Sequence, residues 1–208
     1  MKKIREPKER MSGEERRLMI IDVALKLFAE KGFNGTKTKE IARLAGISET
    51  LIFQHFSSKE DLYQNALNEL FKHHPVVLEV EQYMKEKNDA AVLRTLALHI
   101  INHCRKDPRI AKITILNALE GPILDGHFHK GGNIAAPITD RLASYIKKRS
   151  LDGAFKNVNA DIVARLFIET IDMYIVDQDS AITGPRLHYT DEEVVDTLVH
   201  VFLDGIRQ

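Results

Sequence analysis

Cysteine, proline and long apolar runs are scarce in this chain, and each scarcity excludes a class of protein. A single cysteine, Cys104, excludes an intramolecular disulfide and fits a reducing cytosol. Six prolines and the absence of any low-complexity tract argue against disorder beyond the chain ends. No apolar run approaches the roughly 20 residues that a membrane span needs, and the charged first segment lacks the apolar core of a secretory signal. We therefore expect a folded cytoplasmic protein that does not contact a membrane.

The formal net charge is zero, but the two ends of the chain differ. Residues 1–60 hold 13 Lys and Arg against 9 Asp and Glu, whereas residues 61–208 hold 17 against 21. An excess of cations in the N-terminal part points toward an anionic partner such as DNA, although an ordinary solvated surface would show the same modest excess. Charge alone does not decide between these two interpretations.

Apolar residues recur at three- and four-residue steps along most of the chain, which is the period of an α-helix. Ser12 and Glu15 have the spacing of a capping box and predict a first helix that ends at Lys31-Gly32. The C-terminal part predicts helices over residues 76–87, 90–105, 110–120, 134–148, 159–176 and 190–206. The fold class we expect is therefore all-α.

Residues 36–61 stand out from the rest of the chain. Thr36 or Thr38 can cap a helix, Gly46 tolerates the positive φ of a tight turn, and Ser48 can cap a second, short helix. A helix, a glycine turn and a short second helix predict a helix-turn-helix, whose second helix enters the major groove of DNA.

The spacing within this stretch strengthens that prediction. Ala42 is small where two helices cross, Gly46 follows four residues later, and Ile52 returns to the core six residues after that. Leu51 and Phe53 then face outward from a short polar helix, where base edges and thymine methyl groups would bury them. Packing against the rest of the protein is the alternative explanation for these two side chains.

Three segments within residues 14–62 resemble the TetR family of bacterial transcriptional regulators: A-L-K-L-F-A-E-K-G-F-N-G-T, K-E-I-A-R-L-A-G-I-S and I-F-Q-H-F-S-S-K-E-D-L. The resemblance implies an all-helical homodimer with an N-terminal three-helix DNA-binding domain and a C-terminal helical domain that dimerises and binds a small effector. With the boundary at the His73-His74-Pro75 interruption, we expect three parts. They are a basic arm or frayed end (1–11), the helix-turn-helix domain (12–74) and the effector-binding and dimerisation domain (75–208).

Matched position by position, the resemblance implies that DNA is contacted by Thr38, Lys39, Ser48, Glu49, Thr50, Leu51, Phe53, Gln54, His55 and Lys59. Three of these positions depart from the family's pattern. Phe53 lacks the hydroxyl of the tyrosine often found there, and Gln54 replaces an aromatic residue and could pair with adenine. Glu49 introduces a negative charge that could accept from cytosine N4 or point away. These departures bear on the operator sequence.

The last two helices carry apolar stripes wide enough for two partners. In the family such helices form the four-helix bundle of the dimer, which implies an interface of Ile162, Leu166, Ile171, Val195, Leu198, Val199 and Phe202. Packing within one chain is the alternative.

Polar side chains scattered among aliphatic ones are candidate contacts to an effector: His99, His103, Asn117, Glu120, Tyr145, Glu169 and Tyr174. His99 and His103 have a spacing that can bind zinc, and His127 and His129 form a weaker pair. No H-E-x-x-H motif, nucleophile elbow or phosphate loop accompanies them.

We therefore expect a non-enzymatic regulator without cofactor or metal. It would be a homodimeric repressor that binds a palindromic operator in double-stranded DNA and is released by a small hydrophobic or amphipathic effector. The alternatives are a helical metal-dependent enzyme or a protein-interaction adaptor that retains a helix-turn-helix.

Overall fold

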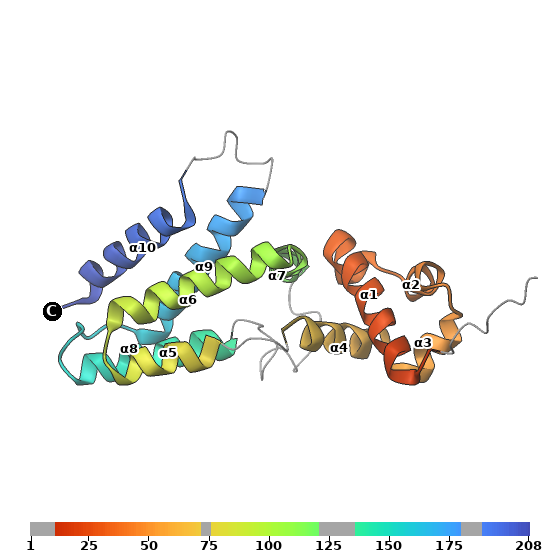
Figure 1. Ribbon diagram of the computed structural model, residues 1–208, viewed down its shortest axis with the longest axis horizontal. Coiled ribbons are helices and arrows are strands. Elements are labelled where there is room, and N and C mark those ends of the chain that lie inside the picture. Colours follow the sequence, from red (N-terminus) through yellow and green to blue (C-terminus); the bar gives the residue numbers. More distant parts are fainter. Residues whose placement is uncertain (1–10, 72–75, 121–135, 180–188) are drawn as a thin grey trace, which may run out of the picture. The chain divides into compact units, whose positions relative to one another are not determined.

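The computed structural model describes residues 11–71, 76–120, 136–179 and 189–208 (Figure 1). Over these residues the chain forms ten α-helices, and the only β contact among them is an isolated bridge between Phe155 and Arg207. The all-α prediction is confirmed. The chain divides into two compact units, Met1–Leu70 and Phe71–Gln208. The basic arm, with the exception of Met11, and four histidines considered above lie outside the described residues: His73, His74, His127 and His129.

The first unit contains α1 (Gly13–Gly35), α2 (Thr38–Ala45), α3 (Glu49–His55) and α4 (Lys59–Phe71). Each helix contributes apolar side chains to one small core, which includes Ile20, Ile21, Ala24, Phe28, Ile41, Ala42, Ile52, Phe56, Leu62 and Ala66. Since α2 and α3 are only eight and seven residues long, this shared core and not helix length stabilises them.

The beginning of α1 matches its sequence signature. The Ser12 hydroxyl accepts a hydrogen bond from the Glu15 amide at 3.2 Å, and the Ser12 amide donates to the Glu15 carboxylate at 2.7 Å. This reciprocal pair is the predicted capping box, and it lowers the pKa of Glu15 by stabilising the charged carboxylate.

The end of α1 differs from the prediction. Gly32 adopts φ 69° and ψ 179°, a conformation essentially restricted to glycine, and the helix then resumes as far as Gly35. Thr36 is fully buried, and its hydroxyl donates to the carbonyl oxygen of Gly32 at 2.7 Å and also contacts that of Leu27 at 3.2 Å. The break at Gly32 leaves carbonyl groups that need a donor, so Thr36 completes α1.

The predicted threonine cap of α2 is therefore wrong. Lys37 occupies the cap position and makes no side-chain capping bond. Thr36 is committed to α1, and Thr38 is already the first helical residue of α2.

The second unit contains α5 (Val76–Lys85), α6 (Asp89–Lys106), α7 (Arg109–Glu120), α8 (Ala136–Leu151), α9 (Ala160–Asp179) and α10 (Asp191–Ile206). Helix α6 packs against α5, α9 and α10, and α8 packs along α9 (Figure 1). The core of the second unit includes Leu93, Leu96, Ala97, Ile101, Leu142, Ile146, Phe167, Ile171, Val195 and Leu203. None of the helices within the described ranges is long and apolar enough to cross a lipid bilayer.

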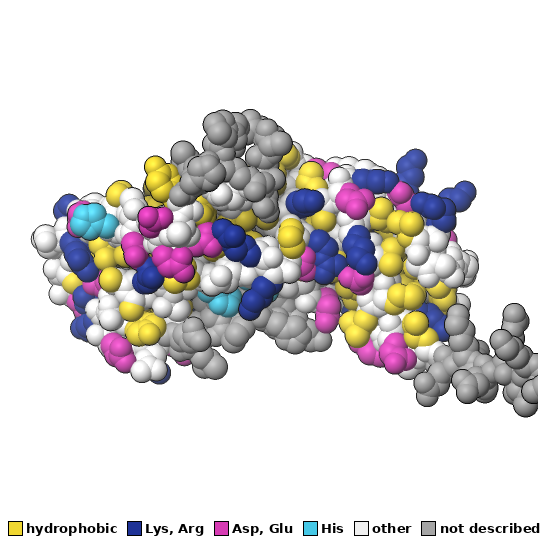
Figure 2. Space-filling view, turned by 45° about the horizontal axis from the view of Figure 1, so that its top comes forward, with side chains coloured by type: hydrophobic (Ala, Val, Ile, Leu, Met, Phe, Trp, Pro, Cys, Tyr) yellow, Lys and Arg dark blue, Asp and Glu magenta, His cyan; other side chains and the backbone are white. Residues whose placement is uncertain are grey.

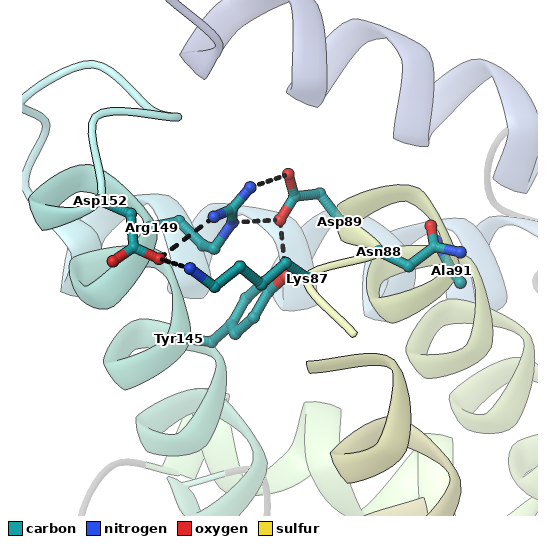
Figure 3. A network of polar contacts seen from close by, with 7 residues as sticks. All are labelled: Lys87, Asn88, Asp89, Ala91, Tyr145, Arg149 and Asp152. Carbon is teal, nitrogen blue, oxygen red and sulfur yellow. Dashed lines mark hydrogen bonds and ion pairs between the residues drawn. The ribbon is translucent and has the colours of Figure 1, made fainter. Parts of the chain in front are cut away.

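A buried ion pair fastens the beginning of α6 to the end of α8 (Figure 3). The Asp89 carboxylate, in a residue that is only 7% exposed, accepts from Arg149 Nε at 2.8 Å and Nη2 at 3.1 Å. The Tyr145 hydroxyl donates to the same carboxylate at 2.6 Å. Burial and the Asp89 charge both raise the pKa of Tyr145, because the phenolate form would be poorly solvated and repelled. Arg149 Nη1 and Lys87 Nζ also reach Asp152, at 3.2 and 2.9 Å.

Replacing Asp89 by Asn should lower the free energy of unfolding by about 3 kcal/mol, because the largely buried Arg149 guanidinium loses its buried charged partner and keeps only the more exposed Asp152. Replacing Asp152 by Asn should lower it far less, since that side chain is 29% exposed and water screens its ion pairs. Urea denaturation followed by circular dichroism measures both. Equal losses for the two variants would contradict the assignment of Asp89 as the central group of the cluster.

Candidate nucleic-acid interface

The turn between α2 and α3 is set by the backbone of Gly46. Gly46 adopts the left-handed conformation, with φ 67° and ψ 32°, and its amide donates to the carbonyl oxygen of Arg43 at 3.3 Å. The next amide, of Ile47, returns to the carbonyl oxygen of Ala42 at 3.0 Å. A Cβ at Gly46 would meet no atom within 4 Å, so the positive φ and not a lack of space requires glycine. The predicted role of Gly46 is confirmed.

Helix α3 begins as predicted and has two contrasting faces. The Ser48 hydroxyl accepts from the Leu51 amide at 3.2 Å and caps the helix. On the inner face Ile52 is fully buried, and Phe56, which follows the helix, is 1% exposed.

The outer face of α3 remains open to solvent. Thr50, Phe53 and Gln54 are exposed, with Phe53 at 46%, whereas Leu51 and His55 are half-buried. Figure 2 shows Lys and Arg side chains together with apolar ones on the surface of the first unit. A short helix that is anchored on one face and offers polar and aromatic groups on the other fits a reading helix.

Glu49 is directed toward α2. Its carboxylate accepts a hydrogen bond from the hydroxyl of Thr38, and both side chains are partly buried. Lys39, the next residue of α2, is exposed. Of the two directions open to Glu49 from the sequence, the structure has the one that points into the protein.

Lys59 opens α4 beside a capped helix start. The Lys59 ammonium lies 4.2 Å from the centre of the Phe33 ring, a cation–π contact. Asp61 accepts from the Ser57 amide at 2.7 Å and hydroxyl at 3.0 Å, and the Asp61 amide donates to Ser58 at 3.1 Å. Ser57 and Ser58, which precede Lys59, thus both bond to Asp61.

In the second unit, the residues predicted to form a dimer interface separate into two groups. Ile162 and Leu166 are 56% and 53% exposed, and Leu198 and Phe202 are half-buried. Three others are buried within the single chain: Ile171, Val195 and Val199. The prediction is corrected for these three, because side chains that fill the chain's own core offer no surface to a second copy.

An apolar groove runs along the exposed side of α9 and α10. It has a volume of about 240 Å³ and is lined by Val163, Val201, Phe202, Gly205 and Ile206. The Phe202 ring meets Phe167 edge to face at 5.0 Å, which fixes one wall of the groove. Met173 and Val201, at 65% and 61% exposed, extend the same apolar surface.

The seven predicted effector contacts are distributed over α6, α7, α8 and α9. Tyr145 belongs to the Asp89 cluster, and Glu169 is exposed and bonded to Arg165 at 2.5 Å. His99 and His103 lie with parallel rings 6.0 Å apart on α6. Asn117 and Glu120 are half-buried on α7.

Tyr174 lines a different cavity. Its hydroxyl donates to Asp191 Oδ1 at 2.8 Å, and Arg105 Nη2 donates to the same oxygen at 2.6 Å. The cavity has a volume of about 270 Å³ and is lined by Ile101, Cys104, Arg105, Pro108, Tyr174, Ile175 and Gln178. Sequence reasoning missed Arg105 and Asp191, since they are 86 residues apart and only packing brings them together.

Asp172 is a half-buried aspartate on α9. Burial, and then repulsion from Glu169, raise its pKa to about 6. Ile168 precedes it by four residues and Ile175 follows it by three, and both are buried. Among the described residues, no group of three or more His, Cys, Asp or Glu could hold a metal ion.

Replacing Asp172 by Asn should change how stability depends on pH. The pKa is raised from 3.8 in the unfolded chain, so stability from the protonated form is complete below pH 3.8 and is lost as the pH rises through about 6. The free energy of unfolding of the wild type should therefore fall by about 2 kcal/mol between pH 3.8 and about 6, whereas that of the variant should not show this fall. Urea denaturation between pH 4 and 7 measures the difference. Asp161→Asn, on the exposed start of α9, is the control, and parallel curves for wild type and Asp172→Asn would contradict the assignment.

Comparison with known proteins agrees with this geometry. The family model described as "Bacterial regulatory proteins, tetR family" matches residues 20–66, which include α2, α3 and most of α1 and α4. The transcriptional regulator AcrR of Shigella flexneri is 36% identical over 95 residues, which are 45% of this chain and 44% of AcrR. The regulator TtgR of Pseudomonas putida is 25% identical over 181 residues, 80% of this chain and 81% of TtgR.

Solved structures share the fold of the whole chain. The regulator FadR from Bacillus subtilis, solved in complex with stearoyl-CoA, has a TM-score of 0.70 and 20% identity and covers 91% of this chain and 99% of its own. The ketosteroid regulator KstR2 of Mycobacterium tuberculosis has a TM-score of 0.65 and 19% identity over 97% of this chain and 100% of its own. The helix-turn-helix geometry and the matching family model agree: residues 20–66 form a domain of the tetR family of bacterial regulatory proteins, and the solved structures show the fold that the chain shares with them.

Proposed function

We propose that this protein is a homodimeric repressor that binds a palindromic operator and is released by a small-molecule effector. One observation carries the proposal: α3 is anchored by the buried Ile52, while Thr50, Phe53 and Gln54 remain exposed on its other face. In a helix-turn-helix this open face is the one that lies in the major groove.

The candidate DNA contacts divide by chemistry into residues that can recognise bases and residues that can bind phosphates. Gln54 can bond to both N6 and N7 of adenine, and Phe53 can contact a thymine methyl group. Lys39, His55 and Lys59 carry or can carry positive charge and would contact phosphates, which position the protein without reading sequence.

Selection of bound genomic fragments by the purified protein tests DNA binding directly. The selected sites should share a palindrome whose half-sites are about one helical turn or a little more apart. Affinity for these sites should fall steeply with salt concentration, because phosphate contacts release counterions. Binding that is absent, or that does not depend on salt, would overturn the proposal.

Two substitutions should separate base recognition from phosphate binding. Gln54→Ala should weaken binding to the selected operator by about 1–3 kcal/mol and relax the preference at one base pair. Lys39→Ala should weaken binding to all sequences alike and make the salt dependence shallower by about one counterion. Fluorescence anisotropy with operator and scrambled duplexes at several salt concentrations measures both. An equal loss on both duplexes for Gln54→Ala would remove its reading role.

The open apolar surface of α9 and α10 supports the dimer. Ile162, Leu166, Met173 and Val201 are each more than half exposed, and the groove beside them contains Gly205, where a helix of a second copy can approach closely. A twofold axis would place the same surface of each copy against the other, which a palindromic operator also requires.

Replacing Leu166 by Arg should convert the dimer to a monomer, because a charge would be buried in an apolar interface. The operator affinity should fall with it, since one reading head alone makes half the contacts. Light scattering after size-exclusion chromatography measures the mass. Leu151→Arg is the matched control, because Leu151 is 81% exposed but belongs to α8. A variant that stays dimeric would place the interface elsewhere.

The cavity beside Tyr174 supports an amphipathic effector. Ile101, Pro108 and Ile175 provide an apolar wall, and Arg105 and Gln178 are lining residues that carry N–H donors. FadR from Bacillus subtilis was solved with stearoyl-CoA, which is itself amphipathic. An effector needs only to bind one geometry of the dimer a few kcal/mol better than the other to release DNA.

A further inference from the structure

Glu49 and Thr38 form a hydrogen bond that links the first residues of α3 and α2. The Thr38 hydroxyl is the donor and the Glu49 carboxylate is the acceptor. Both residues stand at positions that match DNA contacts in the family, yet here their side chains bond to each other. The pair therefore lies within the proposed DNA surface and uses groups that the DNA would otherwise meet.

A hydroxyl group has one hydrogen to donate. While the Thr38 hydrogen is held by Glu49, it is withheld from a phosphate oxygen. The carboxylate oxygen of Glu49 accepts this hydrogen bond as a phosphate oxygen of DNA would.

The charge of Glu49 differs from that of the other acids nearby. Glu40 is paired with the Lys31 ammonium at 2.5 Å, so its charge is compensated. Glu49 instead accepts from a neutral hydroxyl, and among the described residues no ion pair involves its half-buried carboxylate. A phosphate that approaches there is repelled by about 1 kcal/mol at 4 Å in water, a fivefold loss of affinity.

We propose that Glu49 competes with the DNA backbone and does not read a base. It retains the Thr38 hydroxyl and lowers the affinity for every duplex by the same factor. This inference rests on the proposed DNA binding. Its effect is to limit retention of the protein on the large excess of non-operator DNA, where phosphate contacts supply essentially all of the affinity. It also keeps operator binding weak enough for an effector to reverse.

The test compares wild type with Glu49→Gln on a random-sequence duplex and on the selected operator, by fluorescence anisotropy. Glutamine keeps the shape and an acceptor for Thr38 but removes the charge. Both duplexes should bind about fivefold more tightly. Glu30→Gln, an exposed carboxylate on α1, removes the same charge from the same unit and should change the affinity far less.

A second pair of variants tests the hydrogen bond itself. The cost of Thr38→Val should depend on residue 49: it should be smaller while Glu49 holds the hydroxyl than when Glu49 is absent. In a Glu49→Ala background the freed hydroxyl can donate to phosphate, so adding Thr38→Val should cost about threefold. This non-additivity is a readout that a loss of folding would not produce, and thermal unfolding of each variant confirms that it is folded.

The outcomes separate the two proposals. If wild type binds neither duplex, the proposed function fails. If wild type binds but Glu49→Gln tightens neither duplex, or matches Glu30→Gln, the competition is refuted. If Glu49→Gln weakens the operator alone, Glu49 reads a base and the inference is also refuted.

Discussion

The first unit depends on a single backbone conformation, the left-handed turn at Gly46. That turn ends α2 and returns the Ile47 amide to the carbonyl oxygen of Ala42. It allows Ser48 to cap α3 and directs Ile52 into the core. If Gly46 took another conformation, the face of α3 that contains Ile52 would no longer be directed into the core. The separation between an anchored face and an open one therefore originates in one glycine.

In the second unit, the apolar residues of α9 and α10 are divided between the chain's own core and the surface. Helices α9 and α10 use Phe167, Ile171, Val195 and Val199 to close their own core. What remains on the far side is a narrower stripe of exposed apolar residues and a shallow groove. The Asp89 cluster joins α6 to α8. Its residues do not belong to the exposed apolar stripe of α9 and α10, so this contact does not rely on the apolar residues that stay exposed.

Features that arise within one turn of the chain could be predicted from the sequence. The capping box at Ser12, the glycine turn at Gly46 and the cap at Ser48 all depend on residues three or four positions apart. The prediction that Thr36 caps α2 failed because the Thr36 hydroxyl donates to the Gly32 carbonyl oxygen of α1. The unusual backbone at Gly32 leaves that carbonyl group open, and no local sequence pattern reveals it.

Features that depend on packing could be predicted only in part. The apolar stripes of the last two helices were visible, but their division between core and surface depends on where neighbouring helices lie. Ile162 and Ile171 have the same chemistry and opposite exposure. The cavity beside Tyr174 combines residues from α6, α9 and the connection that follows α6, so the sequence prediction found only Tyr174 among its polar lining residues.

The contact between Lys59 and Phe33 has a consequence for conformational entropy. Phe33 itself is fixed by Phe28 and Tyr63, whose ring centres lie 6.1 and 5.1 Å away. A lysine on a free surface samples many rotamers and loses that freedom when it grips an anion. Here the ring has already restricted the ammonium group, so much of that loss occurs during folding and not during binding. In the proposed contact with DNA, the rings of Phe28, Phe33 and Tyr63 would therefore prepare the Lys59 ammonium for a phosphate.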